Sequence, residues 1–533
     1  MLQIQSPFQQ LFDTNGSPLD DGYVYIGTAN TNPETSPIAI YWDDAGTIPA
    51  AQPLRTLNGY IVRSGTPARV YTALEDFSMT VKDRQGRVVF SVLDATADLN
   101  LTTALASSSG SSLVGFLQSG ANAQLRTVQS KLRDVVNVMD FGAQGNGVAD
   151  DTVALQSALN SSLGMSAPSA VFLTATGNLS PTAKTTIAGA GRENTFFRTS
   201  HASNSVFLST AQFVTYRDMT IDRSGAVAGT GITHNAVSNL APLEGLELDR
   251  VNINGHNFGI SIRDLVLGGI RNSYIQAGGT GVDINNTGVN AVASFWMEHV
   301  WIRGNTTVGA NIINCKQTRL QQVAFESAGG RTCPKGLSVI GGNAVYLGNC
   351  WFEALLFGAE FIGCGTVTFD GGYLDGSALT TRGFYSANSS GNTTVIFDGP
   401  WQVENLSVTF ATADDNSTII VRTPSLAAYT FQAVNGGKVI YDFDYVKTQT
   451  YDPPSLSSNG TTTVNVTVPG ASVGDLVTVN FSNGSTDPNL FYWTGTVTGP
   501  DTVVVLLRNM HTLTLDLSSG TLTTRVRKRP LTS

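Results

Sequence analysis

Three acidic residues end similar four-residue segments in the middle of the chain. They are Glu326, Glu353 and Asp375, in the segments Val-Ala-Phe-Glu, Cys-Trp-Phe-Glu and Gly-Tyr-Leu-Asp. In a β-strand the side chains alternate between two faces, so the second and fourth residues of each segment point the same way. Crowded carboxylates raise the pKa of at least one of them, and such a pair can break a glycosidic bond. We therefore interpret these three acids as candidate catalytic residues.

Aromatic residues occupy most of the second positions in the same run of segments. The flat faces of sugars stack on Trp and Tyr rings, while polar neighbours hydrogen-bond the sugar hydroxyls. Another polar position lies five residues before each fourth position and is expected to flank the same groove. The residues expected to bind a sugar chain are Tyr274, Trp301, Arg303, Trp351, Tyr373, Asp370 and Glu298.

The segments recur with a period that indicates a solenoid. Successive fourth positions, from Asn254 to Asp375, are 22, 27, 23, 27 and 22 residues apart. Other short apolar segments precede and follow each one, which gives three short strands per turn and predicts a parallel β-helix. Rungs of a β-helix lie about 4.8 Å apart, so adjacent-rung carboxylates lie about 5 Å apart and alternate-rung ones about 9.5 Å. These values bracket retaining and inverting glycosidases, so the stereochemistry of cleavage stays open.

Two other interpretations of the acids stay open at this point. Outward acids can serve only solubility and the blocking of edge pairing, which would leave a non-enzymatic binding protein. A polysaccharide lyase would need a base such as Arg303 or Tyr373, but an acid-rich groove would repel a uronate. His256 and His299 are interpreted as surface histidines with satisfied polar groups, and no Ser/His/Asp arrangement is readable from the spacing.

Composition and charge exclude several classes of partner. There are 31 Lys and Arg residues against 40 Asp and Glu, which gives a net charge of −9, and charged residues make up only 13% of the chain. Without a basic run, the chain lacks the electrostatic footprint of proteins that bind nucleic acid or anionic membranes. No apolar run approaches the roughly 18 residues of a membrane span, so membrane insertion is not expected.

The sequence predicts neither a metal site nor a cofactor. The four cysteines lie within 50 residues of one another but lack the spacing of metal ligands, so buried thiols are expected. These are Cys315, Cys333, Cys350 and Cys364. The glycines around Gly145 lack the following Gly-Lys-Ser/Thr of a phosphate loop, and a tight turn leading to a capping helix is expected instead.

Four regions with different patterns divide this all-β sequence. Residues 1–98 alternate as strands of a compact β domain. Residues 99–135 combine a Ser/Gly linker with a short helix over residues 126–135, which either lies on its own domain or forms a neck where several copies meet. Residues 136–445 form the parallel β-helix with the groove. Residues 446–533 are expected to form a β-sandwich, with strands at residues 461–468, 476–481, 502–507, 513–517 and 522–526.

Three stretches of the sequence resemble the tailspikes of short-tailed bacteriophages. Gly22-Tyr-Val-Tyr-Ile-Gly27, Ile40-Tyr-Trp42 and Ala51-Gln-Pro-Leu54 resemble their head-binding domain. Residues 126–134 (Arg-Thr-Val-Gln-Ser-Lys-Leu-Arg-Asp), with Asp140-Phe-Gly-Ala and Asp150-Asp-Thr after them, resemble the neck and first turn of pectate-lyase-like phage depolymerases. Val468-Pro-Gly-Ala-Ser-Val-Gly-Asp475 and Leu517-Ser-Ser-Gly-Thr-Leu522 resemble a C-terminal sandwich common in the same proteins.

This resemblance implies a homotrimeric virion protein with a right-handed parallel β-helix. The N-terminal domain would attach it to phage tail or head–neck proteins, and the β-helix would bind and usually cleave a bacterial surface polysaccharide, either O-antigen or capsule. Assembly in the host cytoplasm is consistent with an N-terminus that shows no secretory signal. The expected function is a phage tailspike that depolymerises its polysaccharide by endoglycosidic hydrolysis. The alternatives are a non-enzymatic receptor-binding tail protein and a polysaccharide lyase on the same scaffold.

Overall fold

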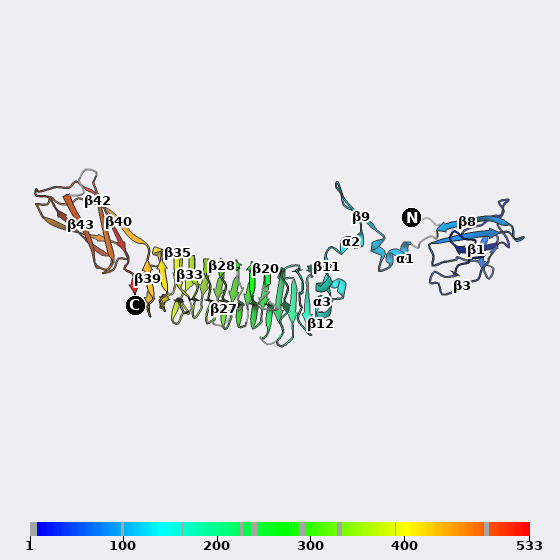
Figure 1. Ribbon diagram of the computed structural model, residues 1–533, viewed down its shortest axis with the longest axis horizontal. Coiled ribbons are helices and arrows are strands. Elements are labelled where there is room, and N and C mark those ends of the chain that lie inside the picture. The colour runs from blue at the N-terminus through cyan, green and yellow to red at the C-terminus, as the bar shows by residue number, and fades with distance from the viewer. Residues whose placement is uncertain are drawn as a thin grey trace. The chain divides into compact units, whose positions relative to one another are not determined.

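Figure 1 shows the computed structural model, which describes residues 8–96, 101–161, 164–223, 228–235, 243–276, 278–286, 294–327, 333–389, 391–483 and 490–532. The chain divides into two compact units, Met1–Asp134 and Val135–Ser533. Nearly all of the regular structure is β-strand, so the predicted all-β class is confirmed.

The first unit contains an antiparallel sheet of six strands in the order β6-β5-β4-β1-β7-β8, and a separate β2–β3 hairpin. Inward residues of β1 and β7, such as Val24, Ile26 and Val81, form its core, and most of the residues between them are half-buried. The strands are β1 (Tyr23–Thr28), β2 (Ile40–Tyr41), β3 (Pro49–Ala50), β4 (Leu54–Leu57), β5 (Tyr60–Arg63), β6 (Thr66–Pro67), β7 (Asp76–Lys82) and β8 (Val88–Thr96).

The rest of the first unit consists of short helices and one hairpin. They are α1 (Leu101–Ala106), the 3₁₀ helix η1 (Gly110–Ser112), β9 (Gly115–Leu117), β10 (Leu125–Thr127) and α2 (Val128–Leu132). The Thr127 hydroxyl caps α2 by accepting the backbone N–H of Ser130 at 3.0 Å, and Arg126 pairs with Asp134 at 2.6 Å. A helix of five residues is marginal by itself, so these two contacts hold it in place.

A parallel β-solenoid forms most of the second unit, in agreement with the sequence-based prediction. Each turn places two short strands, or one bent strand, in a 20-stranded sheet and one strand in a 10-stranded sheet. The first sheet consists of β11 (Val136–Asn137), β12 (Asn146–Asp150), β13 (Gly164–Ser166), β14 (Ala170–Thr174), β15 (Thr185–Ala188), β16 (Thr195–Thr199), β18 (Val214–Arg223), β20 (Leu243–Asn254), β22 (Leu265–Arg271), β23 (Tyr274–Gln276), β25 (Ser294–Glu298), β26 (Trp301–Arg303), β28 (Gln317–Gln321), β29 (Ala324–Glu326), β31 (Ala344–Glu353), β33 (Gly365–Asp375), β35 (Thr393–Glu404), β37 (Thr418–Val421), β39 (Lys438–Tyr441) and β46 (Leu531–Thr532). The second consists of β17 (Phe207–Ser209), β19 (Thr230–Asn235), β21 (Phe258–Arg263), β24 (Thr280–Asn285), β27 (Val308–Ile313), β30 (Leu337–Ile340), β32 (Ala359–Ile362), β34 (Arg382–Ala387), β36 (Thr409–Ala413) and β38 (Phe431–Ala433).

A single residue in the left-handed conformation bends each central turn between its first two strands. The backbone φ angle is 54° at Arg250, 50° at Asn272, 52° at His299, 51° at Gln322 and 48° at Asn349. This region of φ is uncommon for residues other than glycine, and Asn tolerates it best. Because the bend falls at the same place in successive turns, the side chains that follow it stay aligned in columns.

The solenoid begins with the predicted turn and capping helix. The 3₁₀ helix η2 (Val138–Phe141) contacts α3 (Thr152–Ser161), which lies beside β11 and β12 in Figure 1. The buried carboxylate of Asp151 accepts the backbone N–H groups of Gln144 at 2.6 Å and Gly145 at 3.1 Å. These hydrogen bonds give the glycine-containing turn a structural role.

The interior of the solenoid is filled by the residues predicted to face inward. Val300, Ile302, Val323 and Phe325 are all buried. Phe325 stacks on Phe352 of the next rung, with ring centroids 5.3 Å apart. Each fully buried side chain of this size contributes about 1.5–3 kcal/mol, so the core holds the outward columns firmly in place.

The four cysteines are buried in the same core and form no disulfide, which confirms that they are thiols. Burial raises the pKa of the Cys350 and Cys364 thiols to about 12. No helix in the described part of the chain is long and apolar enough to cross a membrane.

Residues after the solenoid form two three-stranded sheets, β40-β45-β42 and β41-β44-β43, around a core that includes Val466, Val505 and Leu522. Their strands are β40 (Asp444–Tyr451), β41 (Thr461–Thr467), β42 (Leu476–Ser482), β43 (Phe491–Gly499), β44 (Thr502–Asn509) and β45 (Gly520–Arg527). The prediction of a strand at residues 513–517 was wrong, because only Leu515 forms a bridge there, with Leu456. The buried Asn509 side chain donates to the Leu513 carbonyl at 2.8 Å and diverts this segment from a sheet.

Candidate functional site

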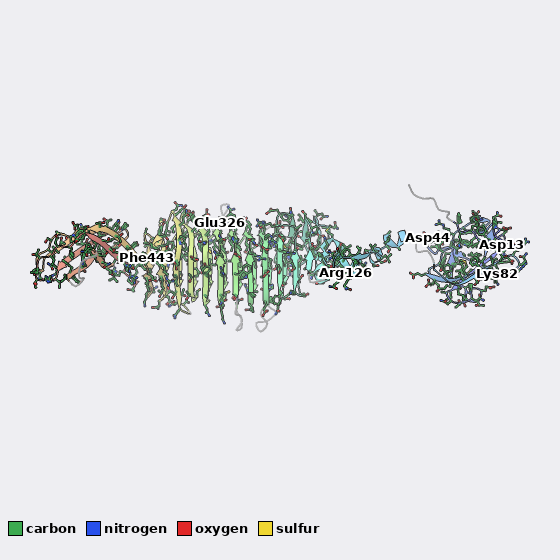
Figure 2. All side chains as sticks on the ribbon, turned by 90° about the horizontal axis from the view of Figure 1, so that it is seen from above. Asp13, Asp44, Lys82, Arg126, Glu326 and Phe443 are labelled. Carbon is green, nitrogen blue, oxygen red and sulfur yellow. The ribbon has the colours of Figure 1, made fainter. Side chains whose placement is uncertain are left out.

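Strand pairing aligns the predicted aromatic residues in one outward column on successive rungs. Tyr274 pairs with Trp301, Trp301 with Ala324, Ala324 with Trp351, and Trp351 with Tyr373. The fourth positions form a parallel column in which Arg303 pairs with Glu326 and Glu326 with Glu353. Figure 2 shows Glu326 on the solenoid.

A cavity of about 360 Å³ opens between the two tryptophans of this column. Trp301 is 50% exposed and Trp351 is 43% exposed, and both line the cavity. The small side chain of Ala324 lies on the rung between them, so the indoles stand about two rungs apart with open space between. Glu326 and Glu353 complete the polar side of the cavity. Stacking surfaces and two acids therefore face one space.

Glu326 is the acid of this cavity that is best suited to donate a proton. Its side chain is buried, with 8% of the residue exposed. Burial raises the pKa of this carboxyl above its ordinary value, and the neighbouring Glu353 charge raises it further. Arg303, whose Nε lies 2.8 Å from Oε1 of Glu326, lowers the pKa by less than burial raises it. A carboxyl with a raised pKa stays protonated at higher pH, as a general acid must.

Glu353 lies on the rung after Glu326 and is the more accessible of the two acids. The indole Nε1 of Trp351 donates a hydrogen bond to its Oε2 at 2.7 Å. This bond fixes the carboxylate next to the tryptophan face on which a sugar ring would stack. Glu326 pairs in register with Glu353, so their backbones lie about 4.8 Å apart and both carboxyl groups can reach one glycosidic bond.

Asp375, the third predicted catalytic acid, does not line the cavity. Its oxygens accept hydrogen bonds from the Ser377 hydroxyl at 2.8 Å, the Ser377 N–H at 3.0 Å and the Asn405 side chain at 3.1 Å. Burial raises the pKa of this carboxyl, but these hydrogen bonds outweigh burial and leave the pKa below its ordinary value. The structure therefore brings Glu326 and Glu353 together and leaves Asp375 at the end of β33, bound to the turn that follows and to the next rung.

The two tyrosines extend the aromatic column at its ends. The ring of Tyr373 stacks on Trp351, with centroids 3.9 Å apart, and its hydroxyl donates to Glu404 at 3.2 Å. Burial and the Glu404 hydrogen bond raise the pKa of Tyr373 to about 12. Tyr274 meets Trp301 edge to face at 6.2 Å and donates to Gln276 at 3.1 Å.

Glu298 and Asp370 belong to a different column, on the strand that precedes the corner. Glu298 lines a separate hollow of about 660 Å³, and Asp370 accepts a hydrogen bond from the Tyr346 hydroxyl at 2.9 Å. The sequence reasoning missed two residues of the smaller cavity, Gln322 and Asn349, which line it from the corner. Their regular place just before each apolar-polar segment was a signal that could have identified them.

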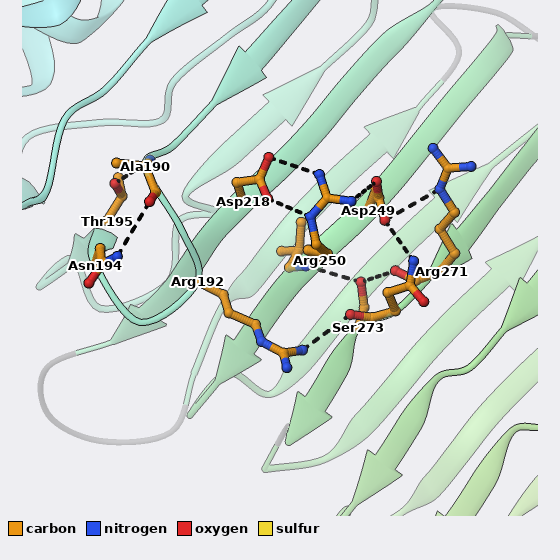
Figure 3. Close-up of polar contacts among 11 residues, drawn as sticks. Ala190, Arg192, Asn194, Thr195, Asp218, Asp249, Arg250, Arg271 and Ser273 are labelled. Atoms are coloured by element: carbon orange, nitrogen blue, oxygen red, sulfur yellow. Dashed lines mark hydrogen bonds and ion pairs between the residues drawn. The ribbon is translucent and has the colours of Figure 1, made fainter.

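The column that contains Glu298 and Asp370 begins, on earlier rungs, with charged residues that form ion pairs. Figure 3 shows Arg250 between Asp218 and Asp249, with ion-pair distances of 2.6 Å to both. Arg271 pairs with Asp249 at 3.3 Å, and Arg192 donates to the Asn272 carbonyl at 3.3 Å. These contacts bind neighbouring rungs together, which distinguishes this end from the open acids of the cavity.

Two histidines lie in the solenoid core. The prediction that His256 is a surface residue was wrong, because its side chain is fully buried. His234 is buried in the same way, and burial lowers the pKa of each histidine to about 4. His299 lies at a corner, and its side chain is more than half exposed. In the described ranges, no three His, Cys, Asp or Glu side chains gather as metal ligands do.

Residues 135–313 match the family described as rhamnogalacturonase A/epimerase, pectate lyase-like. This segment is a pectate-lyase-like domain. It covers the first turns of the solenoid, up to the rung of Trp301 and Arg303. The chain is also 30% identical over 176 residues to the tail spike protein of Shigella phage Sf6, which is 29% of this chain and 28% of that protein. The resemblance to phage tailspikes with a pectate-lyase-like β-helix is thus confirmed, over part of the chain and just over a quarter of the length of this relative.

Three solved structures illustrate what this chain is similar to. Tailspike protein 3 of bacteriophage CBA120 has a TM-score of 0.43 and 14% identity, over 72% of this chain and 76% of that chain. WceF of Pantoea stewartii, described as a glycan biofilm modifying enzyme with a tailspike-like fold, has a TM-score of 0.42 and 12% identity, over 97% and 87% of the two chains. The A-module of the Azotobacter vinelandii mannuronan C-5 epimerase AlgE4 has a TM-score of 0.42 and 16% identity, over 57% and 97%. The solenoid itself is established by its strand pairing.

Proposed function

We propose that the chain is a phage tailspike that binds a bacterial surface polysaccharide, O-antigen or capsule, and cleaves it by endoglycosidic hydrolysis. One observation carries the proposal. Two carboxylates on adjacent rungs, Glu326 and Glu353, face a cavity bounded by two half-exposed tryptophans. Hydrolysis of a glycosidic bond requires a pair of carboxyl groups beside surfaces that hold sugar rings.

The two glutamates have different environments and therefore different roles. Glu326, buried and with a raised pKa, donates its proton to the glycosidic oxygen as the bond to the anomeric carbon breaks. Glu353 is held by Trp351 and acts on the anomeric carbon. In this scheme the Glu353 carboxylate attacks the anomeric carbon and forms a covalent intermediate. Water then hydrolyses that intermediate, with Glu326 as the base that takes its proton.

The aromatic residues hold the polymer across the cavity. Trp301 and Trp351 offer ring faces on each side of the scissile position, and Tyr274 and Tyr373 continue the column along the solenoid axis. Several sugar rings stacked at once give useful affinity for a long chain. Arg303 lowers the pKa of Glu326 and donates hydrogen bonds to nearby sugar hydroxyls.

A lyase mechanism has less support from the geometry. The hydroxyl of Tyr373 has a pKa raised to about 12, and it donates its proton to Glu404. Arg303, the other candidate base, is held against Glu326. Neither group is therefore placed to remove a proton next to a sugar carboxylate.

The proposal includes a homotrimer in the virion, attached to phage tail or head–neck proteins through the N-terminal domain. Apolar side chains stay exposed after η1, in the β9–β10 hairpin and in α2 of the first unit, at Leu113, Leu117, Leu125 and Leu132. In the second unit Val135, Val148 and Val153 are exposed near its start. Within each unit, large apolar residues that stay exposed are typical of a protein interface. Light scattering of the full chain tests this point, and a monomer would contradict it.

The activity is tested with purified protein and surface polysaccharide from candidate host strains. Release of reducing ends without the ultraviolet absorbance of an unsaturated uronate supports hydrolysis. Reducing ends together with that absorbance would identify a lyase. If the protein binds the polysaccharide of a susceptible strain and releases nothing, the chain is a receptor-binding protein without enzymatic activity.

A further inference from the structure

A second and larger hollow, of about 660 Å³, lies on the strands that precede the corner. Pairing places Trp296, Arg319, Tyr346 and Thr368 on four successive rungs of this face. Gln321 lines this hollow, and the next residue, Gln322, lines the cavity of the two glutamates. The two spaces therefore adjoin across the bend, within reach of one polymer.

Two aromatic residues of this hollow are held in fixed positions. The indole of Trp296 lies directly over Gly269 of the preceding rung, where a Cβ atom would come within 2.0 Å of the ring. Glycine at this position is therefore required for the placement of the indole. On the other side of Arg319, the Tyr346 hydroxyl donates to Asp370 at 2.9 Å, which fixes the tyrosine ring. Rings held this way provide stacking surfaces at low cost in conformational entropy.

Arg319 stands exposed between the two rings, with its guanidinium 5.5 Å from the centroid of Tyr346. Along the described chain, no acid lies within ion-pair distance of Arg319. Two other arginines of this sheet are neutralised, since Arg271 pairs with Asp249 and Arg303 with Glu326. A guanidinium without an acid partner is a ready bidentate donor to a carboxylate.

The polar groups around Arg319 limit what the hollow can accept. Ser294, Gln317 and Thr366 offer groups that hydrogen-bond sugar hydroxyls. Glu298 also lines the hollow and is half exposed, so its charge repels anions at that end. A ligand with one negative charge, placed next to Arg319, and with several hydroxyls fits this arrangement.

We propose that this hollow is a second sugar subsite, which takes a sugar residue that carries a carboxylate. Arg319 pairs with the carboxylate, while Trp296 and Tyr346 pack against the ring. The inference rests on the proposed function of the adjoining cavity and names its substrate class, an acidic polysaccharide.

The test is saturation-transfer NMR on the full chain with three probes: sodium D-glucuronate, D-glucose and sodium acetate. We expect D-glucuronate to bind with about tenfold higher affinity than D-glucose, and R319Q to lose about that factor. R319K keeps the charge but loses the bidentate geometry, so it should recover only part of the loss. R217Q, at an exposed arginine of the same sheet outside the hollow, is the matched control and should bind as the parent does.

Any one of three results would overturn the subsite: equal affinity of D-glucuronate for R319Q and for the parent chain, equal affinity of the parent chain for D-glucose and D-glucuronate, or competition by acetate as strong as that by the sugar acid. The readout needs no bond cleavage, so it is independent of the reducing-end assay. If reducing ends are released but D-glucuronate fails to bind, hydrolysis stands and this subsite falls.

Discussion

Arg303 lies 2.8 Å from the carboxylate of Glu326, yet the pKa of Glu326 is above its ordinary value of 4.5. Burial is the larger effect, and the charge of Glu353 on the next rung acts in the same direction. Arg303 therefore limits the rise in the pKa without reversing it. Burial and the Arg303 guanidinium therefore act in opposite directions on the pKa of Glu326, and burial has the larger effect.

Replacing Arg303 with Met should move the alkaline limb of the pH–activity profile to higher pH. Glu326 is active when protonated, so activity falls as the pH rises through its folded-state pKa. Arg303 lowers that pKa, and its removal raises it. The measurement is the pH dependence of kcat/KM, with Arg271→Met, which lies outside the cavity, as the matched control. An alkaline limb that stays in place or moves to lower pH would contradict the assignment.

Replacing Ala324 with Leu should close the space between Trp301 and Trp351. The side chain at this position points outward on the rung between the indoles, so a larger residue fills the cavity without entering the core. We expect binding of the polysaccharide to weaken by about tenfold or more, since neither indole can then stack a ring. Affinity electrophoresis measures the change, and Thr215→Leu, at an outward position of β18, is the control. Unchanged mobility shifts would show that the polymer binds elsewhere.

Replacing Asp375 with Ala should reduce stability and leave turnover within about twofold. The carboxylate accepts three hydrogen bonds from Ser377 and Asn405, and the loss of such a set costs about 1–3 kcal/mol. Thermal unfolding followed by circular dichroism and the reducing-end assay give the two values. A large loss of turnover with an unchanged unfolding temperature would show that Asp375 is a catalytic residue.

Acid should destabilise the solenoid through His234 and His256. Burial lowers the pKa of each to about 4, below the ordinary 6.5. Between these values the unfolded chain binds protons that the folded chain does not, so stability falls as the pH falls through this window. From pH 7 to pH 5 each histidine should cost about 2 kcal/mol.

The check on this effect is urea unfolding of His256→Leu at pH 7 and pH 5. The variant should lose less stability between the two pH values than the parent chain does. His299→Leu, at an exposed corner, should follow the parent. Equal pH dependence in all three chains would show that the buried histidine does not titrate in this window.

The alternation of apolar and polar residues was enough to predict the columns. Trp301, Trp351, Glu326 and Glu353 lie on the rungs where their segments placed them, because strand pairing follows that alternation. The hydrogen bonds of Asp375 depend on a following turn and on the next rung, which alternation does not specify. Arg319 was not predicted because only the last polar residue of the strand before the corner was considered as a ligand-binding position.

The residues around His256 in the sequence also did not predict its burial. Its residue type is common at surfaces, and the corner after β20 was expected to face solvent. In the structure its ring lies close to Gly231 of the neighbouring strand, where a Cβ atom would come within 3.5 Å of it. A contact between rungs more than 20 residues apart cannot be read from either segment alone.

The most direct test of the central claim compares E326Q and E353Q with the parent chain in the release of reducing ends. We expect each variant to lose about 10²- to 10⁴-fold in kcat while still binding the polysaccharide, because the amides keep the shape of the cavity but cannot transfer the proton or attack the sugar. Turnover by both variants at a rate close to that of the parent chain would contradict the assignment of these two glutamates.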